Sequence, residues 1–228
     1  MSMKNILMIG TGGTIASEMT PSGLTPELNS TQLLSFVPRI GEMCHVDCVQ
    51  LYSLDSTNIR PAHWLGVAKT VRENYDRYDG FVISHGTDTM AYTACALSFM
   101  LENLSKPVIL TGSQLPIGML RTDGKENLIT AIEIALAKHP DGTPMVPEVC
   151  IFFESQLMRG NRTTKINAEN FNAFRSYNYP NLAQIGIHIK YETHLIHRPD
   201  PTQPLKAHYL FDSNAVSYTH LTLPTIRL

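Results

Sequence analysis

The chain has 228 residues, 43% of them hydrophobic, which is enough to bury the core of one large domain or of one domain and part of a second. With 18 basic and 20 acidic residues, the formal net charge is -2, and Lys and Arg form no long run. We therefore expect no nucleic acid and no anionic membrane as partner.

The N-terminal segment predicts a cytoplasmic protein. Residues 1–10 contain one Lys and only a short apolar stretch, whereas a secretory signal needs an apolar region of ~7–15 residues and a cleavage site. No run approaches the ~18 apolar residues of a membrane span. Cys44 and Cys48 flank a His and an Asp, but in a strand they would lie ~13 Å apart, too far for a disulfide. We expect reduced thiols and no metal.

Apolar runs alternate with helical patterns along the chain. The expected strands are 4–9, 46–51, 80–84, 107–110 and 148–153, and the expected helices are 29–36, 61–75, 90–101 and 125–138. This alternation predicts an α/β fold, with an open, parallel, doubly wound, flavodoxin-like sheet flanked by helices.

Polar segments, three of them with glycine, follow all five expected strands. In such sheets ligands bind beyond the carboxyl ends of the strands, so these segments should share one rim. They are residues 11–14, 55–58, 85–89, 111–114 and 154–156. Their coincidence predicts an active site at that rim.

The first of these loops suggests a nucleophile. Its glycines do not form a dinucleotide motif, because Ile15 stands where the third glycine belongs, and no Gly-Lys-Ser/Thr follows as in a P-loop. A threonine hydroxyl can act as a nucleophile when a base removes its proton, and we expect Thr14 to do so. The alternative is a structural turn.

Two later loops carry further candidates. Asp88 and its neighbouring threonines could cap the next helix, and the free N–H groups of that helix could also bind an anion, so the two roles are compatible. The segment 158–165 carries three basic side chains, any of which could relay a proton. Their spacing does not choose between Arg159, Arg162 and Lys165.

Three motifs together resemble the bacterial-type L-asparaginase family. They are TGGTIA at 11–16, HGTDT at 85–89 and NRTTK at 161–165. The segments 118–124 and 186–189 are similar to its cytoplasmic type I branch, and the resemblance covers roughly residues 4–214. It implies that Thr14 attacks the side-chain amide carbon of L-asparagine, releasing ammonia and forming an aspartyl ester.

The resemblance also assigns the remaining site residues. Thr87, Asp88 and Lys165 would shuttle protons and activate the water that hydrolyses the ester, and N–H groups near Thr87 would hold the oxyanion. Thr164 would contact asparagine at a second, allosteric site. The substrate's α-amino and α-carboxylate groups would be bound by Asp55, Ser56, Thr57, Thr87 and Asp88. No metal or organic cofactor is implied.

The family's usual organisation predicts a truncated chain. Members have two α/β domains in ~330 residues, more than one typical domain. We expect an N-terminal asparaginase domain at 1–190, a linker and the start of the C-terminal domain at 191–214, and a divergent or foreign tail at 215–228, with the second, smaller domain largely missing. The full-length family forms homodimers or homotetramers. This chain should be weak or inactive.

One departure and three alternatives remain open. Family members often carry a Tyr that orients the nucleophile, but residues 20–26 contain none. Glutamine could be the main substrate, because one methylene is worth only ~1–3 kcal/mol in a pocket. An amidotransferase subunit acting on tRNA would require an appended N-terminal domain. A non-catalytic fragment could still bind amino acid through Ser56 and Asp88.

Overall fold

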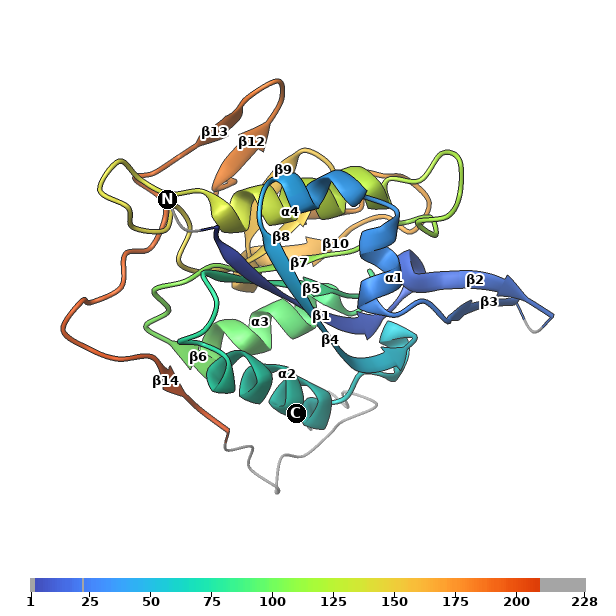
Figure 1. Ribbon diagram of the computed structural model, residues 1–228, viewed down its shortest axis with the longest axis horizontal. Coiled ribbons are helices and arrows are strands. Elements are labelled where there is room, and N and C mark those ends of the chain that lie inside the picture. The colour runs from blue at the N-terminus through green and yellow to red at the C-terminus, as the bar shows by residue number, and fades with distance from the viewer. Residues whose placement is uncertain (1–2, 22, 210–228) are drawn as a thin grey trace, which may run out of the picture.

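A central eight-stranded sheet organises the computed structural model, which describes residues 3–21 and 23–209 (Figure 1). The strand order is β13-β12-β9-β8-β7-β5-β1-β4. In that order the bounds are Ile189–Tyr191, Ala183–Ile185, Gln156–Arg159, Val149–Phe153, Val108–Thr111, Gly80–Ser84, Asn5–Gly12 and His45–Leu54.

Five of these strands form the predicted parallel sheet. β1 pairs in parallel with β4 and β5, and β7 pairs in parallel with β5 and β8. Numbered along the chain, the parallel strands lie in the order 2-1-3-4-5, which is the flavodoxin-like arrangement. The fold class predicted from the sequence is confirmed. The switch point of this sheet lies between β1 and β5.

The antiparallel edge of the sheet was not predicted. After β8 the chain reverses at Glu154, whose φ of 57° is left-handed, and β9 returns beside β8. β12 then pairs antiparallel with β9, and β13 with β12. These strands are three or four residues long and partly polar, so no apolar run marks them in the sequence.

Helices cover both faces of the sheet and give it two cores (Figure 1). α1 (Ser30–Ser35) and α4 (Gly124–Leu136) pack on one face, whereas α2 (Pro61–Glu73) and α3 (Met90–Met100) pack on the other. β1 serves both cores: Ile6 and Met8 point to the first, Leu7 and Ile9 to the second. Burial on both faces explains its continuous apolar run.

Two helix starts follow from the sequence. Asn29 and Gln32 form a capping box, in which the Asn29 side chain accepts from the Gln32 N–H and Gln32 Oε1 accepts from the Asn29 N–H, each at 2.9 Å. Pro61 occupies the first turn of α2, where its missing N–H is not needed.

Several shorter elements lie outside the eight-stranded sheet. A hairpin of β2 (Ser17–Thr20) and β3 (Gly23–Pro26) projects from the fold after the first loop (Figure 1). The other short strands are β6 (Leu101–Glu102), which pairs with β14 (Lys206–Ala207), and β10 (Thr163–Lys165), which pairs with β11 (Phe174–Ser176). The 3-10 turns are η1 (Thr14–Ala16), η2 (Pro38–Glu42), η3 (Ser56–Asn58) and η4 (Gly160–Arg162).

The residues around position 190 still belong to the sheet and its core. β13 runs across residue 190, where we expect the N-terminal domain to end, and Ile196 is still buried in the core beneath α4. The expected tail at 215–228 lies outside the described residues. Within residues 3–21 and 23–209, no helix has the length and apolar character needed to cross a membrane.

Candidate active site

The loops after β1, β4 and β5 meet at the switch point of the sheet. Gly13 has a φ of 83°, and a Cβ built on it would lie 2.3 Å from the N and Cα atoms of Gly86. A Cβ built on Gly86 would in turn lie 2.7 Å from Ser56 Oγ. Only glycine allows this close approach of backbones, so the two glycines bring three loops together.

The two threonines of the first loop have different environments. Thr11 is buried, and its hydroxyl donates to the Ser84 carbonyl at 2.8 Å, which ties β1 to β5. Thr14 begins η1 and is partly exposed. Among the described residues, its hydroxyl makes no hydrogen bond. Thr11 is therefore a structural residue, whereas Thr14 is available for chemistry.

Three site residues far apart in the sequence lie in contact. Lys165 Nζ lies 2.7 Å from Thr87 Oγ1 and 2.7 Å from Asp88 Oδ1. The Lys165 side chain is 16% exposed and the Asp88 side chain 55%, so the amine is largely enclosed while the carboxylate faces solvent. The structure thus brings together the hydroxyl, carboxylate and amine expected from the sequence.

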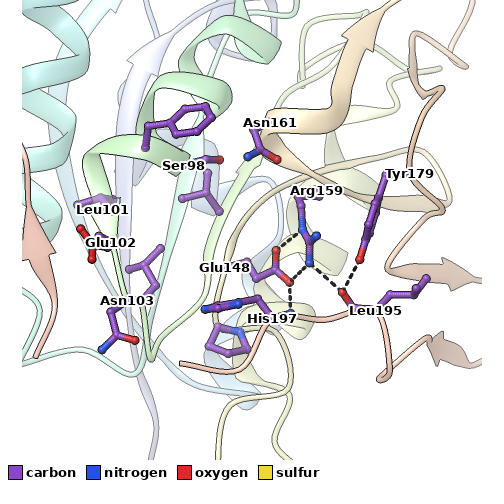
Figure 2. Close-up of a pocket in the computed structure, with 14 residues that line it drawn as sticks. Ser98, Leu101, Glu102, Asn103, Glu148, Arg159, Asn161, Tyr179, Leu195 and His197 are labelled. Carbon is purple, nitrogen blue, oxygen red and sulfur yellow. Dashed lines mark hydrogen bonds and ion pairs between the residues drawn. The ribbon is translucent and has the colours of Figure 1, made fainter. Parts of the chain in front are cut away.

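Arg159 belongs to a different part of the molecule. It forms a two-pronged ion pair with Glu148, with N–O distances of 2.6 and 2.9 Å, and donates to the Leu195 carbonyl at 2.8 Å. Figure 2 shows this cluster in a cavity of about 650 Å³, with Tyr179 beside the guanidinium. The geometry therefore distinguishes the basic side chains that spacing alone could not: Arg159 is a structural anchor, and Lys165 reaches Thr87.

The loop after β4 holds the expected substrate-binding residues. Asp55 Oδ1 accepts hydrogen bonds from the Thr57 N–H at 2.8 Å and the Thr57 hydroxyl at 2.7 Å. Ser56 is buried beside Gly86, and its carbonyl accepts from the Thr89 hydroxyl at 2.7 Å. Asp55 and Thr57 are exposed. The hydrogen bonds between Asp55 and Thr57 order the loop after β4. Ser56 connects this loop to the loop after β5.

Thr164 takes no part in the contacts among Lys165, Thr87 and Asp88. It is exposed on β10, between Thr163 and Lys165. It borders a cavity of about 540 Å³ that is also lined by Asp88 and Lys165. The residue expected at a second site therefore faces a cavity that adjoins the active site.

Gln114 is a contact that the motifs did not single out. Its Oε1 accepts the Thr87 hydroxyl at 3.2 Å, and its Nε2 donates to the Asn170 carbonyl at 3.0 Å. Asp123 accepts from the Gln114 N–H at 2.9 Å and so holds the loop. The available signal was its position at the end of the loop after β7, one of the five rim segments.

Several backbone N–H groups at the site have no protein acceptor. In the described part of the chain, the N–H groups of Thr14, Thr87 and Asp88 donate to no protein atom. They precede or begin the helical turns after β1 and β5. Free N–H groups in such positions can bind an anion or a developing negative charge. Residues 3–21 and 23–209 contain no group of three His, Cys, Asp or Glu that could hold a metal, and the cysteines are free.

Comparison with known proteins identifies the family. The model of the asparaginase N-terminal domain matches residues 5–197. The chain belongs to the asparaginase family. L-asparaginase 1 of Escherichia coli (strain K12) is 46% identical over 194 residues, covering 83% of this chain and 56% of the relative. The asparaginase resemblance inferred from three short motifs is thus confirmed over most of the chain.

Solved asparaginase structures share the fold. L-asparaginase I from Vibrio cholerae O1 biovar eltor superposes with a TM-score of 0.78 at 40% identity, covering 91% of this chain and 61% of that one. The thermostable L-asparaginase from Thermococcus kodakarensis gives a TM-score of 0.77 at 36% identity, covering 90% and 60%. The similarity to L-asparaginase 1 and L-asparaginase I places the chain in the type I branch. The chain spans a little over half the length of these relatives.

Proposed function

We propose that this chain carries the nucleophile and proton-relay half of an asparaginase that hydrolyses the side-chain amide of L-asparagine to L-aspartate and ammonia. The observation that carries the proposal is the Lys165–Thr87–Asp88 contact, set beside a loop whose Thr14 hydroxyl is unengaged. A threonine nucleophile and an enclosed amine together suit acyl transfer from an amide.

The first half of the reaction makes an ester. Thr14 Oγ1 attacks the amide carbon, the C–N bond breaks, and the hydroxyl proton reaches the leaving nitrogen so that ammonia departs. The free N–H groups of Thr14 and Thr87 suit the negative charge that develops on the amide oxygen. In the second half, water attacks the ester, aspartate leaves, and Thr14 regains its proton.

Lys165 and Thr87 are suited to moving these protons. The Thr87 hydroxyl accepts from Lys165 and donates to Gln114, so its oxygen stands between a donor and an acceptor. Thr87 can pass a proton to Lys165 while it accepts one from the attacking water or hydroxyl. Asp88 holds the amine in place.

The loop after β4 suits an amino-acid substrate. The carboxylates of Asp55 and Asp88 attract an α-ammonium, and the hydroxyls of Ser56 and Thr57 can donate to an α-carboxylate. The names of the relatives favour asparagine over glutamine. Glutamine stays the alternative, because the pocket must distinguish a single methylene.

The length of the chain bears on its activity. The chain spans 56% of the length of L-asparaginase 1, so the activity of a whole asparaginase is part of the proposal. We propose that the full-length protein acts in the cytoplasm as a homodimer or homotetramer. The alternative is a catalytically weak chain that only binds amino acid.

Ammonia release from asparagine and from glutamine tests the proposal, with Thr14→Ala beside the wild type. Thr14→Ala should abolish turnover, because it removes the nucleophile. Thr11→Val is the matched control: it should cost roughly 1–2 kcal/mol of stability, through the loss of the hydrogen bond to the Ser84 carbonyl, and retain turnover. Hydrolysis that survives in Thr14→Ala would refute the assignment. For an inactive wild type, calorimetry with aspartate decides whether the site still binds.

A further inference from the structure

Behind the Thr87 loop lies a chain of hydrogen bonds that the proposed reaction does not use. His85 follows β5 and is 1% exposed, yet both ring nitrogens have partners. Nδ1 lies 2.8 Å from the Gly86 carbonyl, and Nε2 lies 2.9 Å from Thr93 Oγ1 on α3. Trp64 Nε1 on α2 donates to the same Thr93 oxygen at 3.0 Å.

The partners fix the direction of every hydrogen bond in this chain. A carbonyl can only accept, so the proton of the imidazole must be on Nδ1. Nε2 is then an acceptor and takes the Thr93 hydroxyl proton, while the Thr93 oxygen accepts from Trp64. Burial lowers the pKa of His85 to about 4, so the ring is neutral near pH 7. His85 thus has one tautomer and one orientation.

The His85 ring donates a hydrogen bond to the Gly86–Thr87 peptide, which belongs to the candidate active site. The Gly86 carbonyl and the Thr87 N–H are parts of the same peptide, and no cis peptide occurs in the described chain. In a trans peptide these two groups point in opposite directions. A donor on the Gly86 oxygen therefore holds the Thr87 N–H on the side away from His85. It also polarises that N–H, because hydrogen bonds in a chain strengthen one another.

The free side of this peptide has no partner within the described chain. The Thr87 N–H donates to no protein atom there, although Gly86 is packed against Gly13, one residue before the proposed nucleophile. We propose that His85 is a positioning residue that holds the Gly86–Thr87 peptide with its N–H ready to donate to the oxygen of the reacting amide. The inference rests on the proposed amide hydrolysis, and adds to it a role for a side chain that does not touch substrate.

Two substitutions at His85 separate positioning from packing. His85→Leu retains most of the buried volume but has no donor, whereas His85→Asn loses volume but can place an N–H close to the position of Nδ1. We expect kcat to fall by about 5- to 50-fold in His85→Leu, with KM within about threefold, because an oxyanion donor acts mainly in the transition state. His85→Asn should recover most of this loss.

Thr93→Val provides an independent variant of the same chain. It retains the side-chain shape but removes the hydroxyl that donates to Nε2, so the loss in kcat should be smaller than in His85→Leu. His188→Leu, at an exposed position, is the control and should leave kcat unchanged. The proposal is overturned if His85→Leu matches the wild type, or if His85→Asn is no more active than His85→Leu.

Nitrogen NMR of the ring gives a readout that does not depend on turnover. In the wild type near pH 7 we expect a neutral His85 with its proton on Nδ1, and a Thr87 amide resonance that shifts in His85→Leu and Thr93→Val. A ring protonated on Nε2, or a Thr87 resonance unchanged in both variants, overturns the proposal. If the wild type releases no ammonia, the proposed function fails for this chain, and these spectra still decide the role of His85.

Discussion

Lys165 Nζ lies 2.7 Å from Thr87 Oγ1, although the two residues are 78 positions apart in the sequence. The contact joins β10 to the loop after β5, and the same amine reaches Asp88. The amine is thus largely enclosed and is held between a hydroxyl and a carboxylate. Each of these contacts can be tested by substituting one residue at a time.

Removing the amine should stop proton transfer without unfolding the protein. We expect Lys165→Met to lower kcat by about 100- to 10,000-fold, the usual range for losing a general acid–base group, and to change the melting temperature little. Ammonia release and thermal unfolding measure the two effects. Arg162→Met is the control, because Arg162 is exposed on the neighbouring turn. Equal losses in both variants would indicate a general effect of charge.

The close approach of Gly13 and Gly86 should make Gly13 intolerant of a side chain. Gly13→Ala places a Cβ against backbone and forces a methyl group onto a residue with a φ of 83°. We expect a loss of at least about 2 kcal/mol in the free energy of unfolding. Gly41→Ala should be neutral, because Gly41 has no positive φ and nothing lies within 4 Å of its built Cβ. Urea denaturation of the pair provides the test, and equal stability would contradict the packing argument.

The ion pair between Glu148 and Arg159 should contribute to stability and not to chemistry. Its side chains are 8% and 19% exposed, so Arg159→Met would leave a largely buried carboxylate without its cation. We expect a loss of about 3–5 kcal/mol, the usual cost of breaking such a pair. The double variant Glu148→Gln with Arg159→Met should lose less. A double-mutant cycle by urea denaturation measures the coupling, and additive losses would show that the pair is not coupled.

The buried His85 should make stability fall as the solution becomes acidic. Its pKa is about 4 in the folded chain against 6.5 for an exposed His, so between those pH values the unfolded chain binds the extra proton. Stability therefore rises with pH across this window, and its full benefit is present above about pH 6.5. Across this window, the contribution of His85 to the free energy of unfolding changes by on the order of 3 kcal/mol. Urea denaturation at pH 4 and pH 7 should show a smaller difference in His85→Leu than in the wild type.

Four of the parallel strands, β1, β5, β7 and β8, could be predicted because each carries a continuous apolar run. Ile6 to Ile9 are buried on both faces, and such runs need no partner to be recognised. β9 could not be predicted in this way, because its position depends on a left-handed Glu154 and on pairing with a strand already formed. Sequence reasoning identifies what an element buries by itself, but not short strands whose hydrogen bonds are supplied by neighbours.

The same distinction applies to the site. Thr14 and Asp88 stand at the ends of predictable strands, so their place on one rim followed from topology. Lys165 arrives on a short strand after a reversal, and spacing alone could not prefer it to Arg159. The proposed role of His85 was hidden for another reason: its ring contacts Thr93 on α3, which in turn accepts from Trp64 on α2, and nothing in their sequence spacing links these residues.

Arg159 and Lys165 are the two ends of one short segment. The first is fixed by Glu148 and Leu195, and the second must reach Thr87 across the turn of η4. The number of residues between Arg159 and Lys165 therefore determines how far the amine reaches from the ion pair that fixes Arg159. Arg159 itself has no role in the proposed reaction. Shortening η4 by one residue would leave the sheet able to form but would carry the amine out of reach. The fold could in this way survive a change that silences the chemistry.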